Sequence, residues 1–241
     1  MNLYLWILVG IAAVPLVLSF DRKVHYVSRW PAVFAAAGIV GVVYIGWDIL
    51  KTSAGVWGFV ERYSGSLEIL GLPLPEILFF VVVPFSCIFI YEVVRAYFKE
   101  RVVPIPRWIW FVAAGVLAVL AVIFRSRLYT LTVLLSAALF FVLTAAVRPG
   151  LLGSRHFWLA VVLTYVPFLI FNGLLTAVPI VVYNDAENWG IRVYTIPLED
   201  FFYSFSLLGF NFLVFRLLRR PGERRSASAE KRSASGEGGR E

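Results

Sequence analysis

Two short segments decide the interpretation of this chain: Pro73-Leu74-Pro75-Glu76-Ile77-Leu78-Phe79-Phe80 and Pro197-Leu198-Glu199-Asp200-Phe201-Phe202-Tyr203-Ser204. Each begins with Pro-Leu, carries one or two carboxylates, and leads into a long apolar run rich in aromatic residues. The segments are offset by 124 residues, which aligns Glu76 with Asp200. Carboxylates that lead into membrane-spanning helices are costly to place. Their recurrence predicts a duplicated chain with a site shared between its halves.

The composition is that of an integral membrane protein. Of 241 residues, 60% are hydrophobic and 15% are charged, and the mean hydropathy is +0.82. A soluble domain is usually nearer half apolar and a quarter charged. Within a bilayer, backbone polar groups are satisfied in helices. The single Cys87 excludes an intrachain disulfide, and the sequence has no Cys/His spacing typical of zinc sites, so no metal is expected.

Seven apolar runs reach or approach the length needed to cross a bilayer. They cover residues 2–20, 31–50, 76–98, 105–124, 128–147, 157–182 and 197–218. The sixth run contains Pro167, Asn172-Gly173 and Pro179, so we expect it to be kinked or broken. The predicted fold class is all-α, a polytopic membrane bundle of about seven transmembrane helices.

Basic residues are concentrated in alternate connections between these runs, which indicates that those connections are cytoplasmic. The predicted protein is a multi-pass protein of the cell membrane, with its N-terminus outside and its C-terminus in the cytoplasm. Arg22 and Lys23 follow the first apolar run, so this run is expected to be a spanning helix rather than a signal peptide. The net charge of +7 is explained by topology and by the basic C-terminus, and no nucleic-acid binding is expected.

The two acidic segments lie four spans apart and therefore point the same way, which predicts a parallel tandem repeat. The first repeat covers residues 1–100, a connector helix covers 101–127, and the second repeat covers 128–220. Residues 221–241 are rich in Ser, Gly, Arg and Glu and are expected to form a disordered cytoplasmic tail.

Polar residues converge on the outer side of the predicted bundle. A carboxyl group at the start of a helix in apolar surroundings is either a helix cap or a proton donor, and the local pattern leaves both open. Aromatic rings beside an acid are suited to stabilising a carbocation. The carboxylates of interest are Glu76, Glu199 and Asp200. The residues expected to contact a substrate are Trp47, Asp48, Phe79, Phe80, Asn184, Phe201, Phe202 and Tyr203.

These residues resemble the small, non-flavin lycopene β-cyclases of carotenoid biosynthesis. The resemblance rests on Trp47-Asp48, on a Pro-x-Glu-Glu-x-x-Phe-Phe pattern near Glu76, and on the run from Ile196 to Tyr203. This family occurs as two short membrane subunits or as one fused chain. The resemblance covers nearly the whole of residues 1–220, which corresponds to the fused form. Pro75 stands where the family pattern has a first glutamate, so the first motif has one acid and the second has two.

The resemblance implies cyclisation of the linear ends of lycopene to β-ionone rings, giving γ-carotene and then β-carotene. It implies proton addition, ring closure through a tertiary cation and proton loss, with no net redox change and no cofactor. It assigns Glu76, Glu199 and Asp200 as the acid and base candidates, with the second motif favoured. The implied partners are a carotenoid substrate from the bilayer, the lipid membrane and other carotenoid enzymes.

Other functions remain open at this point. A related carotenoid hydratase would end the cation with water instead of proton loss. A non-enzymatic or proton-coupled membrane carrier would also use acids within the membrane, although normally near the midplane. In a structural membrane subunit, the acids would be helix caps.

Overall fold

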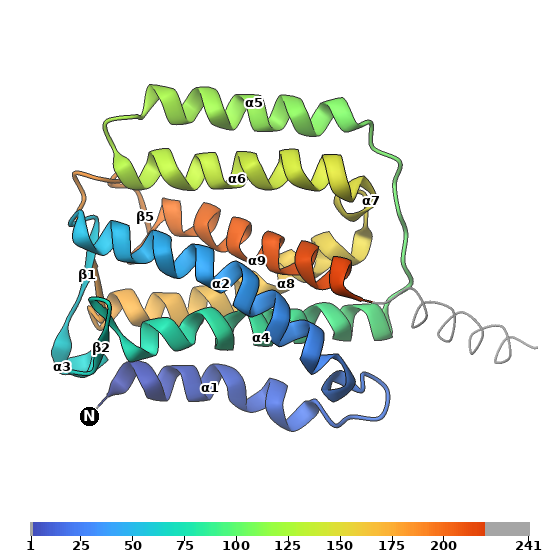
Figure 1. Ribbon diagram of the computed structural model, residues 1–241, viewed down its shortest axis with the longest axis horizontal. Helices are drawn as coiled ribbons and strands as arrows, with labels where there is room; N and C mark the ends of the chain where they lie inside the picture. Colours follow the sequence, from blue (N-terminus) through green and yellow to red (C-terminus); the bar gives the residue numbers. More distant parts are fainter. Residues whose placement is uncertain (1, 220–241) are drawn as a thin grey trace, which may run out of the picture.

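The structure is a computed structural model, and it describes residues 2–219. Long helices lie side by side along the molecule, with the connections gathered at its two ends (Figure 1). The long helices are α1 (Leu3–Leu18), α2 (Trp30–Ser53), α4 (Leu74–Tyr97), α5 (Arg107–Ile123), α6 (Leu128–Val147), α8 (Arg155–Ala177) and α9 (Leu198–Leu218). The short ones are η1 (Tyr26–Arg29), α3 (Glu61–Ser64) and α7 (Pro149–Leu152). The predicted all-α class is confirmed, whereas the predicted disordered tail lies outside the described residues.

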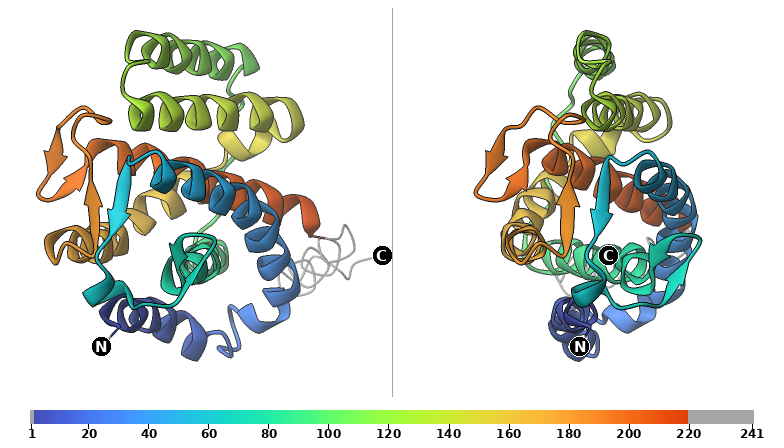
Figure 2. Two further views of the ribbon diagram at one scale, coloured as in Figure 1. Left: turned by 60° about the vertical axis from the view of Figure 1, so that its left-hand side comes forward. Right: turned by 90° about the vertical axis from the view of Figure 1, so that its left-hand side faces the viewer.

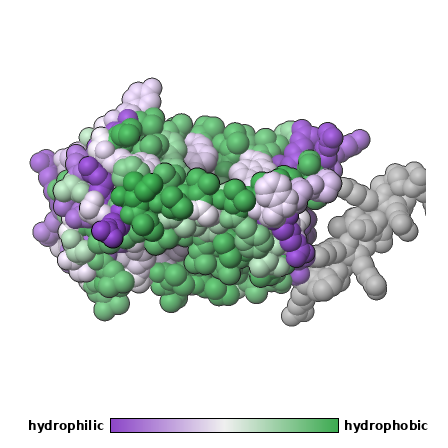
Figure 3. Space-filling view, turned by 90° about the horizontal axis from the view of Figure 1, so that it is seen from above, coloured by the Kyte–Doolittle hydropathy of each residue, from purple (hydrophilic) through white to green (hydrophobic). Residues whose placement is uncertain are grey.

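The protein is embedded in the membrane by long apolar helices. Within residues 2–219, five helical stretches are long and apolar enough to cross a bilayer: Tyr26–Ser53, Leu74–Tyr97, Leu128–Val147, Arg155–Ala177 and Leu198–Leu218. Helices α1 and α5 are also apolar but shorter, with 16 and 17 residues. The surface shows a broad apolar band with hydrophilic residues at both ends (Figure 3). The count of seven spans stays a prediction.

Helix α8 differs from its predicted form. It is continuous through Pro167 and Asn172-Gly173, and the break expected in this run occurs only after the helix, at Pro179. Neighbouring helices and side chains can satisfy the backbone groups that proline frees within a membrane bundle. The helix ends at Ala177 rather than near 182, because the chain turns at Pro179 and then forms strand β4 (Val181–Tyr183).

Short strands cover the end of the molecule where the N-terminus lies (Figures 1 and 2). Strand β1 (Trp57–Phe59) pairs antiparallel with β4, and two hairpins are formed by β2 (Glu68–Ile69) with β3 (Leu72–Pro73) and by β5 (Arg192–Val193) with β6 (Ile196–Pro197). The hairpin turns contain Leu70 and Tyr194 at φ of 55° and 57°. The sequence predicted no strands here, because strands of two or three residues show no detectable period.

The two acidic segments form equivalent helix starts. Pro73 and Pro197 precede α4 and α9 with φ of −57° at both and ψ of 142° and 143°. Proline is pre-organised for this position, where no backbone N–H is needed for the helix. Each acidic residue therefore falls in the first turn, where the helix dipole favours a carboxylate.

Helix α4 lies at the centre of the bundle and packs against α1, α2, α8 and α9. Helix α5 lies outside the bundle and packs on α6 (Figure 2). Helices α6 and α9 approach closely where Phe140 covers Gly209, since a Cβ added at Gly209 would lie 2.7 Å from Phe140 Cε2. These contacts leave a cavity beside α4, under the strand-covered end.

Candidate active site

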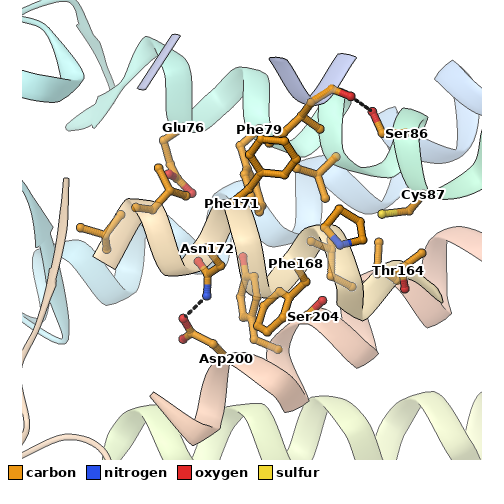
Figure 4. A pocket seen from close by; sticks show the side chains of 18 of the residues that line it. Glu76, Phe79, Ser86, Cys87, Thr164, Phe168, Phe171, Asn172, Asp200 and Ser204 are labelled. Carbon is orange, nitrogen blue, oxygen red and sulfur yellow. Dashed lines mark hydrogen bonds between the residues drawn. The ribbon is translucent and has the colours of Figure 1, made fainter. Parts of the chain in front are cut away.

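A cavity of about 350 Å³ lies among α1, α4, α8 and α9 and beneath strands β1 and β4. Three carboxyl groups, those of Asp48, Glu76 and Asp200, contribute to its wall. In Figure 4, Glu76 and Asp200 lie towards one end of the cavity, while Ser86, Cys87 and Thr164 lie towards the other. No Lys, Arg or His is found among the described residues of the lining. The cavity is therefore apolar and acidic at one end.

Asp200 is held by three neutral donors from three elements. Its Oδ1 accepts a hydrogen bond from the Tyr129 hydroxyl of α6 at 2.5 Å. Its Oδ2 accepts from Asn172 Nδ2 of α8 at 2.8 Å and from the Tyr183 hydroxyl of β4 at 2.9 Å (Figure 4 shows the Asn172 bond). Burial raises the pKa of Tyr183 well above its ordinary value, and the neighbouring Asp200 adds to this effect. Tyr183 is thus a hydroxyl donor.

Asp48 and Glu76 form a carboxyl pair on α2 and α4. Glu76 Oε2 accepts from the Tyr4 hydroxyl at 2.6 Å, and Asp48 Oδ1 accepts from Trp57 Nε1 at 2.7 Å. Both carboxyl groups line the same cavity, and Asp48 Oδ2 is buried without a hydrogen-bond partner among the described residues. No cation lies in the described lining to balance two negative charges, so one of the two acids is expected to carry a proton.

Aromatic rings surround the carboxyl groups. The Trp57 and Tyr129 ring centroids are 5.0 Å apart, Tyr129 stacks on Tyr183 at 5.8 Å, and Trp57 lies 6.5 Å from Tyr203. Further rings continue along the cavity wall, from Phe59, Phe79, Phe168 and Phe171. Ring faces attract a cation by roughly 0.5–2 kcal/mol. The site therefore combines proton-carrying groups with surfaces that can stabilise a positive charge.

The structure brings several predicted site residues together and leaves others outside the cavity. Asp48, Glu76, Asp200, Phe79 and Tyr203 line it. The predicted residues that do not line it are Trp47, Phe80, Asn184, Glu199, Phe201 and Phe202.

Glu199 is buried but faces away from the cavity. Its Oε1 accepts from Thr130 Oγ1 at 2.5 Å and from the backbone N–H of Trp189 at 2.7 Å. It therefore ties α9 to α6 and to the loop that precedes β5.

The remaining predicted residues have packing or loop contacts. The Trp47 ring packs on Tyr44 and Tyr203 at 5.2 and 5.3 Å, which places it behind the cavity wall. Phe80 is fully buried beside Tyr44. Asn184 is exposed, and its side chain donates to the Gly55 carbonyl. Phe201 and Phe202 line a separate pocket between α6, α8 and α9.

Sequence reasoning missed the donors to the carboxyl groups, which are Tyr4, Trp57, Tyr129, Asn172 and Tyr183. Asn172 was considered only as part of the kink or break expected in the sixth apolar run. One signal could have found Asn172, because the offset of 124 residues aligns it with Asp48. The tyrosines carried no comparable signal.

A comparison with protein-family models matches the family described as lycopene cyclase, over residues 1–94 and 126–218. These residues make up most of the chain and include all three cavity carboxyl groups. The chain belongs to the lycopene cyclase family. The lycopene cyclase family model does not match residues 95–125 of this chain, and these residues contain α5. No curated protein and no solved structure matches the chain significantly. The apolar cavity fits the lipophilic carotenoid on which a lycopene cyclase acts.

Proposed function

We propose that the chain is a lycopene β-cyclase, an isomerase that converts the linear ends of lycopene to β-ionone rings. One ring would give γ-carotene and two would give β-carotene. The observation that carries the proposal is the set of three carboxyl groups, held by neutral donors, at one end of an apolar cavity lined by aromatic rings. This arrangement can give a proton to a hydrocarbon and take one back.

The proposed reaction moves protons without any electron carrier. A carboxyl proton adds to the terminal double bond, leaving a tertiary carbocation. A neighbouring double bond of the chain attacks this cation, which closes the ring and moves the positive charge to a ring carbon. A carboxylate then removes a proton from the adjacent carbon, and the ring double bond forms. One proton enters and one leaves, so the product is an isomer of the substrate.

The walls of the cavity would protect the cation during ring closure. Rings of Trp57, Tyr183 and Tyr203 lie beside the carboxyl groups and can stabilise positive charge. The apolar lining keeps water scarce, and a cation that meets water would become an alcohol. This argument favours cyclisation over hydration.

We infer a parallel tandem repeat, with α5 as the connector. Its support is a constant offset of 124 residues between the two halves. Adding 124 to a residue number in the first half gives the corresponding residue of the second half for four features: the ends of α2 and α8, strands β1 and β4, strands β3 and β6, and the starts of α4 and α9. Strands β1 and β4 pair with each other in a symmetric register, with Gly58 opposite Val182. This register is what two copies related by a twofold axis would produce.

We also propose that the acidic end faces outward, with the N-terminus outside and the C-terminus cytoplasmic. The connections 19–29, 98–106 and 148–154, which carry many of the basic residues, lie together at the opposite end (Figure 1). Cys87 is the single cysteine and is buried, so a thiol reagent should label an introduced surface cysteine selectively. Tyr194→Cys should react with an impermeant thiol reagent on intact cells, and Val102→Cys only after permeabilisation. The reverse pattern would invert the topology.

Expression in a host that accumulates lycopene, followed by pigment chromatography, tests the activity. We expect γ-carotene, β-carotene or both to replace lycopene. Unchanged lycopene, with the protein shown to be in the membrane, would contradict the proposal. Hydroxylated carotenoids without rings would identify a hydratase instead.

A further inference from the structure

The same pair of positions occurs once in each half of the site. Asp48 on α2 and Asn172 on α8 are offset by 124 residues, as are Glu76 on α4 and Asp200 on α9. Asp48 and Glu76 both line the cavity, and Asn172 Nδ2 donates to Asp200 Oδ2 at 2.8 Å. In the first half, the counterpart of the Glu76 carboxyl group is therefore an acid, Asp48. In the second half, the counterpart of the Asp200 carboxyl group is an amide, Asn172.

The first half holds a proton between two acids. Tyr4 and Trp57 each supply one hydrogen bond, to Glu76 and to Asp48 respectively. Asp48 Oδ2 is buried and has no hydrogen-bond partner among the described residues, which is the environment that a protonated carboxyl oxygen tolerates better than a charged one. We expect these two buried carboxyl groups to retain a proton between them, because the described cavity lining holds no cation that would balance two negative charges. This half is therefore built to donate.

The second half offers a carboxylate that is already supplied with donors. Asp200 accepts from Tyr129, Asn172 and Tyr183, which together occupy both of its oxygens. The Asn172 amide donates a hydrogen bond but has no acidic proton to give. This half is therefore built to accept a proton.

We propose that the two halves have divided the proton chemistry, with the Asp48–Glu76 pair as the acid and Asp200, positioned by Asn172, as the base. The assignment rests on the proposed cyclase function. Glu76 and Asp200 approach the same end of the cavity from α4 and α9, so an end group between them has the donor on one side and the acceptor on the other (Figure 4). Each turnover moves one proton from the pair to the substrate and one from the ring cation to Asp200. The pair regains a proton and Asp200 releases one before the next turnover.

Deuterium incorporation in membranes supplied with lycopene in heavy water separates the two roles. Asp48→Asn and Glu76→Gln should lower ring formation by roughly 10²–10⁴-fold, the usual contribution of a general acid. Lycopene recovered from both variants should contain no deuterium, because the cation never forms.

Asp200→Asn should also lose β-ring formation, but its acid remains intact. The cation then forms and returns its proton, is captured by water, or loses a proton from another neighbouring carbon. We expect deuterium in the recovered lycopene, or products with a displaced ring double bond or a hydroxyl group. Asn172→Asp places a second acid beside Asp200, so that this carboxyl also shares a proton, and should give the same pattern. It serves as a second variant if Asp200→Asn does not reach the membrane.

Glu199→Gln is the matched control, because Glu199 adjoins Asp200 but lies outside the cavity. The division of roles would be overturned if both second-half variants gave unlabelled lycopene and no product with a displaced ring double bond or a hydroxyl group. Labelled lycopene from Asp48→Asn or Glu76→Gln would overturn it as well. Absence of rings from the unaltered protein would instead contradict the cyclase function itself, so the two failures are distinguishable.

Discussion

Two adjacent acids, Glu199 and Asp200, have different surroundings. Successive helical residues point about 100° apart around the axis. Asp200 consequently faces the cavity, while Glu199 faces Thr130 and the loop at Trp189. The sequence identified both as candidate acids, since it shows their spacing but not the rotation of α9 against its neighbours.

Glu199→Gln should therefore keep most of the cyclase activity, because the amide oxygen can still accept from Thr130 and Trp189. Glu199→Ala should leave both donors unpaired in a buried position, at a cost of about 1–3 kcal/mol each. Carotene yield and thermal unfolding in detergent measure the two effects. An inactive but stable Glu199→Gln variant would show that Glu199 takes part in the chemistry.

Tyr4 offers a second test at this scale. Its hydroxyl donates to Glu76 at 2.6 Å, and Tyr26 makes a bond of equal length to the Phe85 carbonyl at the far end of the bundle. Tyr4→Phe should slow ring formation because Glu76 loses its orienting donor. Tyr26→Phe should lower stability to a similar extent and leave the turnover rate unchanged. Equal rates in single-turnover assays of the two variants would remove Tyr4 from the site.

At the scale of elements, the sequence predicted the helices well because apolar runs of helical length are unambiguous. The run at 128–147 coincides with α6, and the starts of α4 and α9 were marked by Pro-Leu. The strands and the end of α8 were not predicted. Their formation depends on pairing between segments far apart in the chain, such as β1 with β4.

Contact between α6 and α9 depends on Gly209. A Cβ there would lie 2.7 Å from the Phe140 ring, whereas one at Gly115 on α5 would meet nothing within 4 Å. Gly209→Ala should destabilise the protein by about 1–3 kcal/mol, the usual cost of overpacking. Gly115→Ala should be neutral or stabilising, because alanine favours helix. Thermal unfolding in detergent compares them, and Phe140→Leu should restore the loss at Gly209. Equal stability of the two glycine variants would contradict the close packing.

At the scale of the whole molecule, composition and charge predicted a membrane protein, but no pattern in the sequence predicted the cavity. The cavity arises where α1, α4, α8 and α9 fail to fill the space between them, which depends on side chains from all four helices. The pairing of Asp48 with Glu76 was hidden for the same reason, although both residues had been singled out.

The cavity also opens toward lipid beside α1. Val14 lines the cavity and is 60% exposed, whereas Val17, one turn further along, is 74% exposed and does not line it. Val14→Trp should obstruct a carotenoid that enters from the bilayer and slow lycopene consumption several-fold. Val17→Trp, which adds the same bulk to lipid-facing surface, should have no effect. Identical rates in membranes would indicate that the substrate takes another route.

The pairing of β1 with β4 has a consequence for the evolution of both halves. Trp57 is opposite Tyr183, and these two residues donate to Asp48 and Asp200 respectively. Successive strand residues point to opposite faces, so a slip of one position in either strand would turn that strand's donor away from the carboxyl groups. An insertion or deletion within either strand would thus remove one donor from the site and also disturb the ladder that positions the donor of the other copy. Length changes on this side of the molecule are consequently tolerable only in the hairpins and loops flanking that ladder.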